Sequence, residues 1–170
     1  KTEDMMLGAL NCPFGTGHMG ITAENVAKEN NITRSKQDEF ALESQKRALK
    51  ALDGKYFEDQ IIPIHIKKGK NIETFKIDEH PKDTSIQSLN ELPPVFKKNG
   101  TVTAGNSSGI NDGAAALILA TESEVIKSKL HPKAKILGYA HSGVRPEVMG
   151  VGPIPAVKKL CKKLNFDLEK

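Results

Sequence analysis

Two cysteines and five histidines are the side chains in this 170-residue sequence that could support nucleophilic or metal chemistry. Cys12 and Cys161 lie far apart and form no C-x-x-C pair, so the sequence predicts neither a zinc site nor a disulfide framework. A reducing compartment is therefore the default. His18 stands beside Met19 just before a predicted helix start, where such a pair usually packs against apolar neighbours. The other histidines have no partner at the spacing of a metal site or a catalytic triad, which predicts structural or exposed roles for His65, His80, His131 and His141.

Residues 100–116, GTVTAGNSSGINDGAAA, are the stretch best suited to approach a ligand. A short β-branched run precedes a block of Gly, Asn and Ser, and an alanine-rich apolar run follows it. Gly105, Gly109 and Gly113 lack a Cβ, so the backbone there can adopt positive φ and come close to a bound molecule. The simpler interpretation from composition alone is a connecting loop before a buried helix that Asp112 could cap.

The surrounding elements are predicted from hydrophobic periodicity and from turn formers. Thr22 and Thr33 are the predicted N-caps of two helices, and Gly54 is the predicted end of the second. Residues 114–120 are apolar on all sides and are expected to be buried. The mixture of helices and apolar strands predicts an α/β fold. The predicted helices cover residues 23–29, 34–53, 86–91, 122–129 and 155–164, and the predicted strands cover residues 61–66, 72–77 and 134–140.

The totals describe a globular chain long enough for a sizeable core, with 38% hydrophobic residues and a net charge of +4. No apolar run is long enough to span a membrane, and no secretory signal opens the sequence. The first residue is not Met, as expected for an excised piece. Lysine clusters usually mark solvated faces, but they could also attract an anion, including a nucleic acid. Aromatic residues between the lysines are too few to favour nucleic acid.

Five stretches, in order, resemble the thiolase family, closest to its acetyl-CoA acetyltransferase (acetoacetyl-CoA thiolase) branch. The resemblance covers nearly all 170 residues and implies a thiolase-like α/β fold. The matching stretches are HMGITAENVA (18–27), RSKQD with Ser44-Gln45, LPPVF (92–96), the run at 100–116 and MGVGPIPA (149–156).

The resemblance also implies a domain division. Residues 1–108 would form most of the inserted loop domain that binds coenzyme A, and residues 109–130 would end the N-terminal half of the fold. Residues 131–170 would begin the C-terminal half. The whole enzyme would be a homodimer or homotetramer, and it would be cytoplasmic unless an organelle houses it.

Site residues follow from the resemblance position by position. Met19 matches a residue of the short acyl pocket, and His18 matches one beside the pantetheine arm. Ala104 and Ser108 match positions that contact pantetheine amides, which lose water in a narrow tunnel and need partners there. The remaining matches are a pocket-wall leucine, Leu10, and positions around the adenine end of the coenzyme, namely Ser88, Leu89, Phe96 and Lys82. Lys82 stands where the family often has an arginine, and its point charge would stack less well on adenine.

The resemblance assigns no catalytic residue to this sequence. A thiolase carries its acyl group on an activated cysteine, with a histidine and a second cysteine to move protons. Neither Cys12 nor Cys161 matches those positions, so the segment alone is expected to be inactive. The implied function is the central part of an acetyl-CoA C-acetyltransferase that uses coenzyme A thioesters as substrates and holds no permanent cofactor or metal. Two alternatives stay open: a non-catalytic thiolase-like protein that binds coenzyme A or a lipid carrier, and a basic module that binds nucleic acid.

Overall fold

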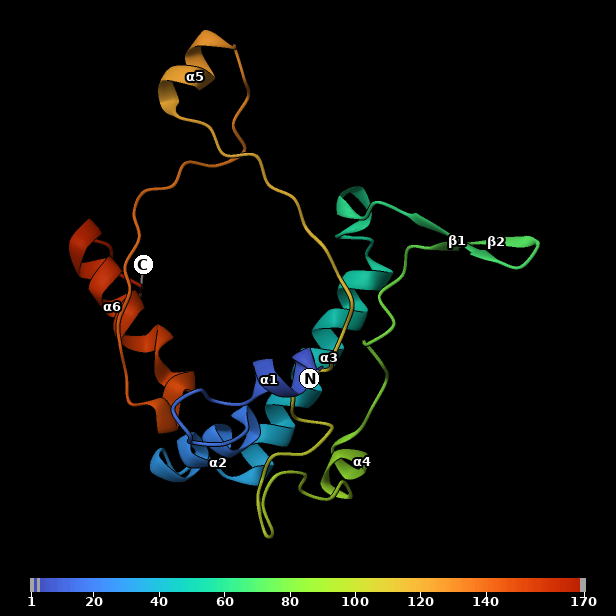
Figure 1. The fold of residues 1–170 in the computed structure, drawn as a ribbon, viewed down its shortest axis with the longest axis vertical. Coiled ribbons are helices and arrows are strands. Elements are labelled where there is room, and N and C mark those ends of the chain that lie inside the picture. The colour runs from blue at the N-terminus through green and yellow to red at the C-terminus, as the bar shows by residue number, and fades with distance from the viewer. Residues whose placement is uncertain (1, 3, 169–170) are drawn as a thin grey trace.

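The computed structural model describes residues 2 and 4–168. Within this part of the chain, helices alternate with long loops and one two-stranded antiparallel sheet, as Figure 1 shows. The mixed helix and strand content agrees with the predicted class. In chain order the elements are α1 (Met5–Leu10), α2 (Met19–Glu29), α3 (Arg34–Asp53), η1 (Glu58–Gln60), β1 (Ile64–Lys68), β2 (Asn71–Phe75), α4 (Ile86–Asn90), α5 (Glu122–Lys127), η2 (Pro146–Val151) and α6 (Pro153–Leu164).

Helix α2 begins earlier than predicted, because His18 rather than Thr22 caps it. The His18 Nδ1 accepts a hydrogen bond from the Gly20 N–H at 3.0 Å, which satisfies one of the free donors of the first turn. The Thr22 hydroxyl instead donates to the Met19 carbonyl at 2.7 Å. Histidine is not among the usual N-cap residues, so the sequence pattern favoured the threonine.

Helix α3 begins and ends where the sequence predicted. The Thr33 hydroxyl accepts from the Lys36 N–H at 3.3 Å, and Gly54 follows the last helical residue. The left-handed residue, however, is Lys55, with φ 56°, whereas Gly54 has φ −78°. Glycine is needed at 54 for space: a Cβ there would lie 2.5 Å from the Tyr56 ring.

The predicted pair of strands is present as a hairpin of β1 and β2, which Figure 1 shows extending away from α3. Ile64 lies opposite Phe75, and Lys68 lies opposite Asn71, so the turn is shorter than the predicted 67–71. Gly69 has φ 62° in this turn, a conformation that favours glycine. Every residue of both strands is exposed.

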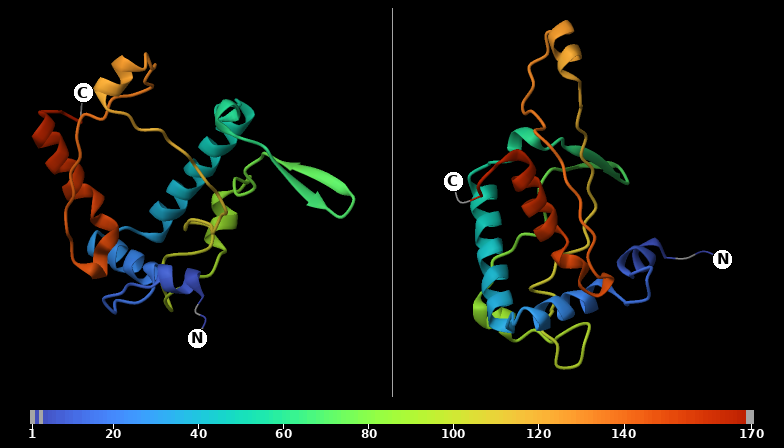
Figure 2. Two further views of the ribbon diagram at one scale, coloured as in Figure 1. Left: turned by 45° about the horizontal axis from the view of Figure 1, so that its top comes forward. Right: turned by 90° about the vertical axis from the view of Figure 1, so that its left-hand side faces the viewer.

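Three predictions for residues 112–140 are wrong. Residues 114–120 form an extended loop rather than a buried element, with side chains of Leu117 and Ile118 that are 90% and 96% exposed. Residues 134–140 form no strand, and Asp112 caps no helix. A strand needs a hydrogen-bonding neighbour and an apolar run needs a cover, and the described residues supply neither at these positions. Figures 1 and 2 show α5 standing apart at the end of these two loops.

Helix α6 starts at Pro153, which takes the first-turn position predicted for Pro155. It follows directly on η2, and η2 packs against α2. The Asn25 side-chain amide donates to the Glu147 carbonyl at 3.0 Å, and the Arg145 guanidinium meets the Glu29 carboxylate at 2.8 Å. These contacts attach the C-terminal helices to the N-terminal ones.

The buried interior is small, in contrast to the sizeable core that the length allowed, and polar residues make up half of the buried side chains named below. Among the described residues, the buried hydrophobic side chains are Ala27, Leu89, Val102 and Val148, and the buried polar or charged ones are Thr22, Glu24, Asp38 and Thr103. Polar side chains therefore hold the centre of this structure together. Within the described chain, no helix combines the length and the apolar character that crossing a membrane requires.

Candidate functional site

A pocket of about 210 Å³ lies where α3, α4 and the loop after Val102 meet. Three separate parts of the chain contribute to it, namely α3 through Gln45, residues 80–92 and residues 104–107. Four of the nine predicted site residues line this pocket. The full lining is Gln45, His80, Lys82, Thr84, Ser88, Leu89, Leu92, Ala104, Gly105 and Ser107.

Two further residues lie at the pocket. His80 is exposed, as predicted, and is one of the lining residues. Ser107 lines the pocket, whereas Ser108 is exposed and does not. Ser107 donates its hydroxyl hydrogen bond to the Thr103 carbonyl at 2.7 Å, so it also braces the loop. Gln45 contributes from α3, and its side-chain oxygen accepts from the Lys82 N–H at 3.0 Å.

The loop at residues 103–107 is shaped by two side chains that sequence reasoning did not assign to the site. The fully buried Thr103 hydroxyl accepts from the N–H groups of Gly105 and Asn106, at 3.2 and 3.3 Å. Asn106 Oδ1 accepts from the Thr103 N–H at 2.8 Å, so the two residues close the turn from both sides. Such local side-chain bonds are what Asn and Thr supply in turns. In the sequence, the Gly, Asn and Ser composition of this stretch was the signal that could have pointed to these two residues.

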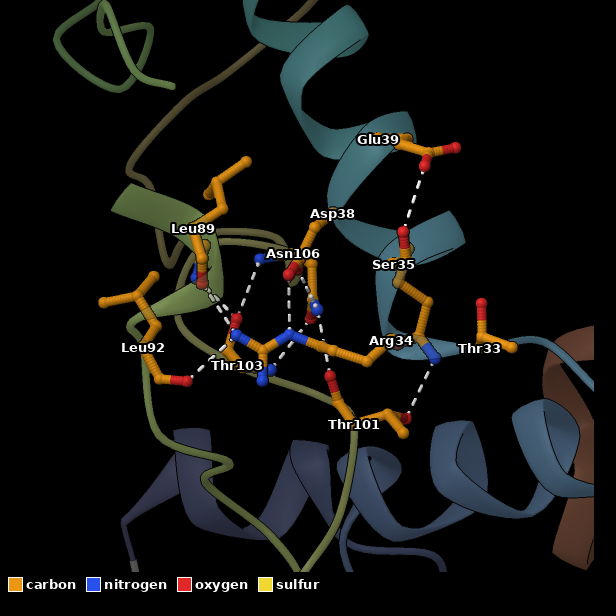
Figure 3. Close-up of polar contacts among 12 residues, drawn as sticks. Thr33, Arg34, Ser35, Asp38, Glu39, Leu89, Leu92, Thr101, Thr103 and Asn106 are labelled. Atoms are coloured by element: carbon orange, nitrogen blue, oxygen red, sulfur yellow. Dashed lines mark hydrogen bonds and ion pairs between the residues drawn. The ribbon is translucent and has the colours of Figure 1, made fainter. Parts of the chain in front are cut away.

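Figure 3 shows an ion pair next to this loop, in which Asp38 is buried and the Arg34 side chain is 24% exposed. The Arg34 Nε donates to Asp38 Oδ2 at 2.7 Å, one helical turn further along α3. The same guanidinium donates to the carbonyls of Leu89 and Leu92, at 2.7 and 2.9 Å. Asp38 Oδ1 accepts from the Asn106 amide at 2.9 Å, and Asp38 is completely buried. Both charges are thus paired and hydrogen-bonded, as burial requires.

A second buried carboxylate holds the chain just before the loop. Glu24 of α2 accepts from the N–H groups of Thr101 and Val102, at 2.7 and 2.8 Å, and from the Thr101 hydroxyl at 2.9 Å. Glu24 is only 6% exposed. Val95 donates its N–H to the Val102 carbonyl at 3.0 Å. The segment of Thr101 and Val102 is therefore hydrogen-bonded both to Glu24 of α2 and to Val95.

His18 and Phe96 form a separate unit at the start of α2. Their rings are stacked, with centroids 4.7 Å apart and planes 22° from parallel. Gly20 lies directly below the Phe96 ring, close enough that a Cβ at residue 20 would collide with it. The structure thus brings His18 and Phe96 together but places both outside the lining of the 210 Å³ pocket.

Met19 lines a second, mainly apolar pocket of about 290 Å³ between α2, η2 and the loop after α1. Cys12 and Thr22 also line it. Leu10, the last residue of α1, is half-buried but is absent from this lining, while its neighbour Ala9 is present. The other lining residues are Asn11, Pro13, Phe14, Val144, Pro146 and Met149.

Cys12 is the thiol with a perturbed pKa in this pocket. The Thr16 hydroxyl beside the sulfur, followed by the Phe14 backbone, lowers the pKa of Cys12 below its ordinary value. The Thr16 oxygen is buried and makes no hydrogen bond of ordinary length and angle within the described chain. No histidine contributes to this pKa shift. The described residues contain no cluster of three or more potential metal ligands.

Comparison with known proteins agrees with this architecture. Residues 1–123 match the family "Thiolase, N-terminal domain". The chain is 53% identical over 167 residues to the beta-ketothiolase BktB of Cupriavidus necator, covering 97% of this chain and 42% of that protein. It is 45% identical over 170 residues to the mitochondrial 3-ketoacyl-CoA thiolase of Bos taurus, covering 99% of this chain and 43% of that protein.

Solved structures agree as well. The acetyl-CoA acetyltransferase of Bacillus anthracis superposes with a TM-score of 0.94 at 45% identity, covering 99% of this chain and 43% of that one. Human mitochondrial 3-ketoacyl-CoA thiolase in complex with CoA gives 0.90 at 44% identity, covering 99% and 42%. The chain therefore spans less than half the length of the relatives it matches. The fold is thiolase-like, and the chain belongs to the thiolase family.

Proposed function

We propose that this chain is the central part of an acetyl-CoA C-acetyltransferase and that it supplies the coenzyme A pocket and part of the acyl pocket. The observation that carries the proposal is the convergence of the 103–107 loop, α4 and Lys82 on one pocket. These are the segments that the resemblance assigned to coenzyme contacts. A relative of high structural similarity was solved with CoA, which supports a coenzyme site in this fold.

The reaction would proceed by ping-pong acyl transfer. A cysteine thiolate outside this chain would attack the carbonyl carbon of one acetyl-CoA, form an enzyme thioester and release coenzyme A as the thiol. A second acetyl-CoA would lose an α-proton to a base, and its carbanion would attack the thioester. The products would be acetoacetyl-CoA and the free enzyme thiol, and thiolysis is the reverse.

Within this chain the proposed work is binding and orientation. Ala104, through its carbonyl, and Ser107 or Ser108 would meet the pantetheine amides. Ser88, Leu89 and Lys82 would lie toward the nucleotide end. Met19 and its apolar pocket would receive the short acyl group, with Leu10 at its margin and with His18 and Phe96 beside the arm. Electrostatic attraction would favour binding of the anionic coenzyme, because the net charge of this chain is +4.

The proposed preference for a short acyl chain needs a test of its own, because the relatives include both acetyl-CoA acetyltransferases and 3-ketoacyl-CoA thiolases. Comparing kcat/KM for acetoacetyl-CoA and for a longer 3-ketoacyl-CoA, with the protein expressed from its complete reading frame, tests it. We expect the short substrate to be preferred and Met19→Ala and Ser108→Ala to raise KM. Unchanged KM values in both variants would remove these site assignments. The isolated 170-residue segment should show no thiolysis.

The domain division, a homodimeric or homotetrameric assembly and a cytoplasmic location belong to the same proposal. The exposed apolar side chains of residues 114–120 support the division, because in the complete protein the two thiolase halves would cover them.

A second candidate is a non-catalytic thiolase-like protein that binds coenzyme A. Under this candidate the complete protein would resemble the described part of the chain, where neither Cys12 nor Cys161 is paired with a histidine, and would carry no catalytic cysteine. Incubating the complete protein with acetyl-CoA and weighing it by mass spectrometry separates the two. A stable acetyl adduct on a cysteine supports the enzyme, and coenzyme binding without an adduct supports the binding protein.

A further inference from the structure

We infer that the Arg34–Asp38 pair of α3 is a positioning element that sets the distance between the two walls of the coenzyme pocket. The inference rests on the proposed function of that pocket. Neither residue lines the pocket, so both would act through the segments they hold.

Arg34 holds the first wall, which is α4. Its terminal nitrogen donates to the Leu89 carbonyl at 2.7 Å and to the Leu92 carbonyl at 2.9 Å. Leu89 belongs to α4 and Leu92 follows its end, so both carbonyls lie where a positive charge is favoured. Ser88 and Leu89, on the same helix, face the pocket.

Asp38 holds the second wall, which is the loop at residues 103–107. Its Oδ1 accepts from the Asn106 amide at 2.9 Å, and that amide also donates to the Thr101 carbonyl at 2.9 Å. Ala104, Gly105 and Ser107 of this loop face the pocket. The ion pair therefore joins the two walls through one continuous chain of hydrogen bonds, which Figure 3 shows.

The walls are in close contact, so a small displacement of either one changes the pocket. A Cβ added to Gly105 would lie 2.5 Å from Leu89 Cδ2 and 2.6 Å from Leu92 Cδ1. The planar guanidinium can donate to Asp38 and to two carbonyls at fixed angles, which a lysine ammonium cannot reproduce. Replacing arginine by lysine would keep the charge and lose this geometry.

The same helix offers a matched control. Arg47 and Glu43 form an ion pair with the same i, i+4 relation and the same 2.7 Å distance, but their side chains are 79% and 54% exposed. Neither residue lines the pocket. Arg47→Lys therefore makes the same chemical change in α3 without touching either wall.

The test measures coenzyme A binding by calorimetry and steady-state kinetics in protein expressed from the complete reading frame. We expect Arg34→Lys to weaken coenzyme A binding about tenfold, the effect of one lost charge-assisted hydrogen bond. KM for the coenzyme substrate should rise in parallel, while kcat per titrated active site stays within about twofold. Asn106→Ala, which leaves the ion pair intact, should also raise KM, and Arg47→Lys should change neither constant.

Coenzyme affinities of Arg34→Lys and Asn106→Ala equal to that of the wild type would overturn the inference. So would a lower kcat per titrated active site at unchanged KM, because the pair would then affect the reaction rather than coenzyme binding. If both variants fail to fold while Arg47→Lys folds, the pair serves the fold alone. Coenzyme A binding by the wild-type protein is measured first. If the wild type does not bind coenzyme A, the proposed function itself is contradicted, whatever the variants do.

Discussion

The Glu24 carboxylate accepts hydrogen bonds from both the N–H and the hydroxyl of Thr101, at 2.7 and 2.9 Å, across 77 residues of sequence. Together with the bond from the Val102 N–H, this contact fixes the chain that leads into the pocket loop. A helix predicted from a capping threonine thus carries a buried acceptor for a segment far along the chain.

Replacing Glu24 by alanine leaves the Thr101 and Val102 N–H groups buried without an acceptor. Each unsatisfied donor costs about 1–3 kcal/mol, so we expect the local free energy of opening to fall by about 3 kcal/mol. Hydrogen exchange of the peptide covering residues 95–106 should accelerate by about two orders of magnitude. Glu29→Ala removes only the exposed ion pair to Arg145 and should change exchange little. Equal effects of the two variants would contradict the assignment.

Gly20 and Gly8 are both helical glycines, but their surroundings predict opposite results for substitution by alanine. A Cβ at Gly20 collides with the Phe96 ring, whereas a Cβ at Gly8 meets nothing within 4 Å. Gly20→Ala should lower the free energy of unfolding by about 1–3 kcal/mol through overpacking. Gly8→Ala should be neutral or stabilising by up to about 1 kcal/mol, because alanine favours the helix. Thermal unfolding of both variants measures the difference, and a destabilised Gly8→Ala would refute the reasoning.

His18 has two structural roles that substitutions can separate. Asparagine is a favoured N-cap but cannot stack, so His18→Asn should lose only the ring contact with Phe96, worth about 0.5–1.5 kcal/mol. His18→Ala should lose the cap as well, at a further cost of about 1 kcal/mol. The difference should appear in hydrogen exchange at the first turn of α2. Identical exchange in both variants would show that Nδ1 does not cap the helix.

Cys12 should react faster with iodoacetamide than an unperturbed thiol at neutral pH. Its lowered pKa places more of the thiol in the reactive thiolate form at any pH below that pKa, so the rate should reach half its plateau at a lower pH. Thr16→Val removes the largest cause and should move the midpoint to higher pH. Peptide mapping after timed alkylation across pH 6–10, a range chosen to bracket ordinary thiol titration, gives the profile. The same midpoint in Thr16→Val and wild type would exclude the hydroxyl as the cause.

The sequence by itself determined the local elements whose signals are complete within a few residues. Thr33 predicted the start of α3, and hydrophobic periodicity with turn formers predicted the two strands of the hairpin. The family signature within residues 100–116 also predicted the loop that reaches the pocket. These features depend on capping, periodicity and turn chemistry, which act between near neighbours.

Tertiary structure decided the features that depend on partners distant in sequence. The sequence did not predict four of these contacts: the cap by His18, the Arg34–Asp38 ion pair, and the hydrogen bonds of Asn106 and Glu24. Charged and amide side chains usually face solvent, so their sequence gives no sign of a buried partner. Residues 114–120 show the converse, since their apolar composition predicted burial but only a covering element can supply it. Burial and long-range pairing are properties of the packed arrangement, and a segment's own sequence states only what it could bury or bond.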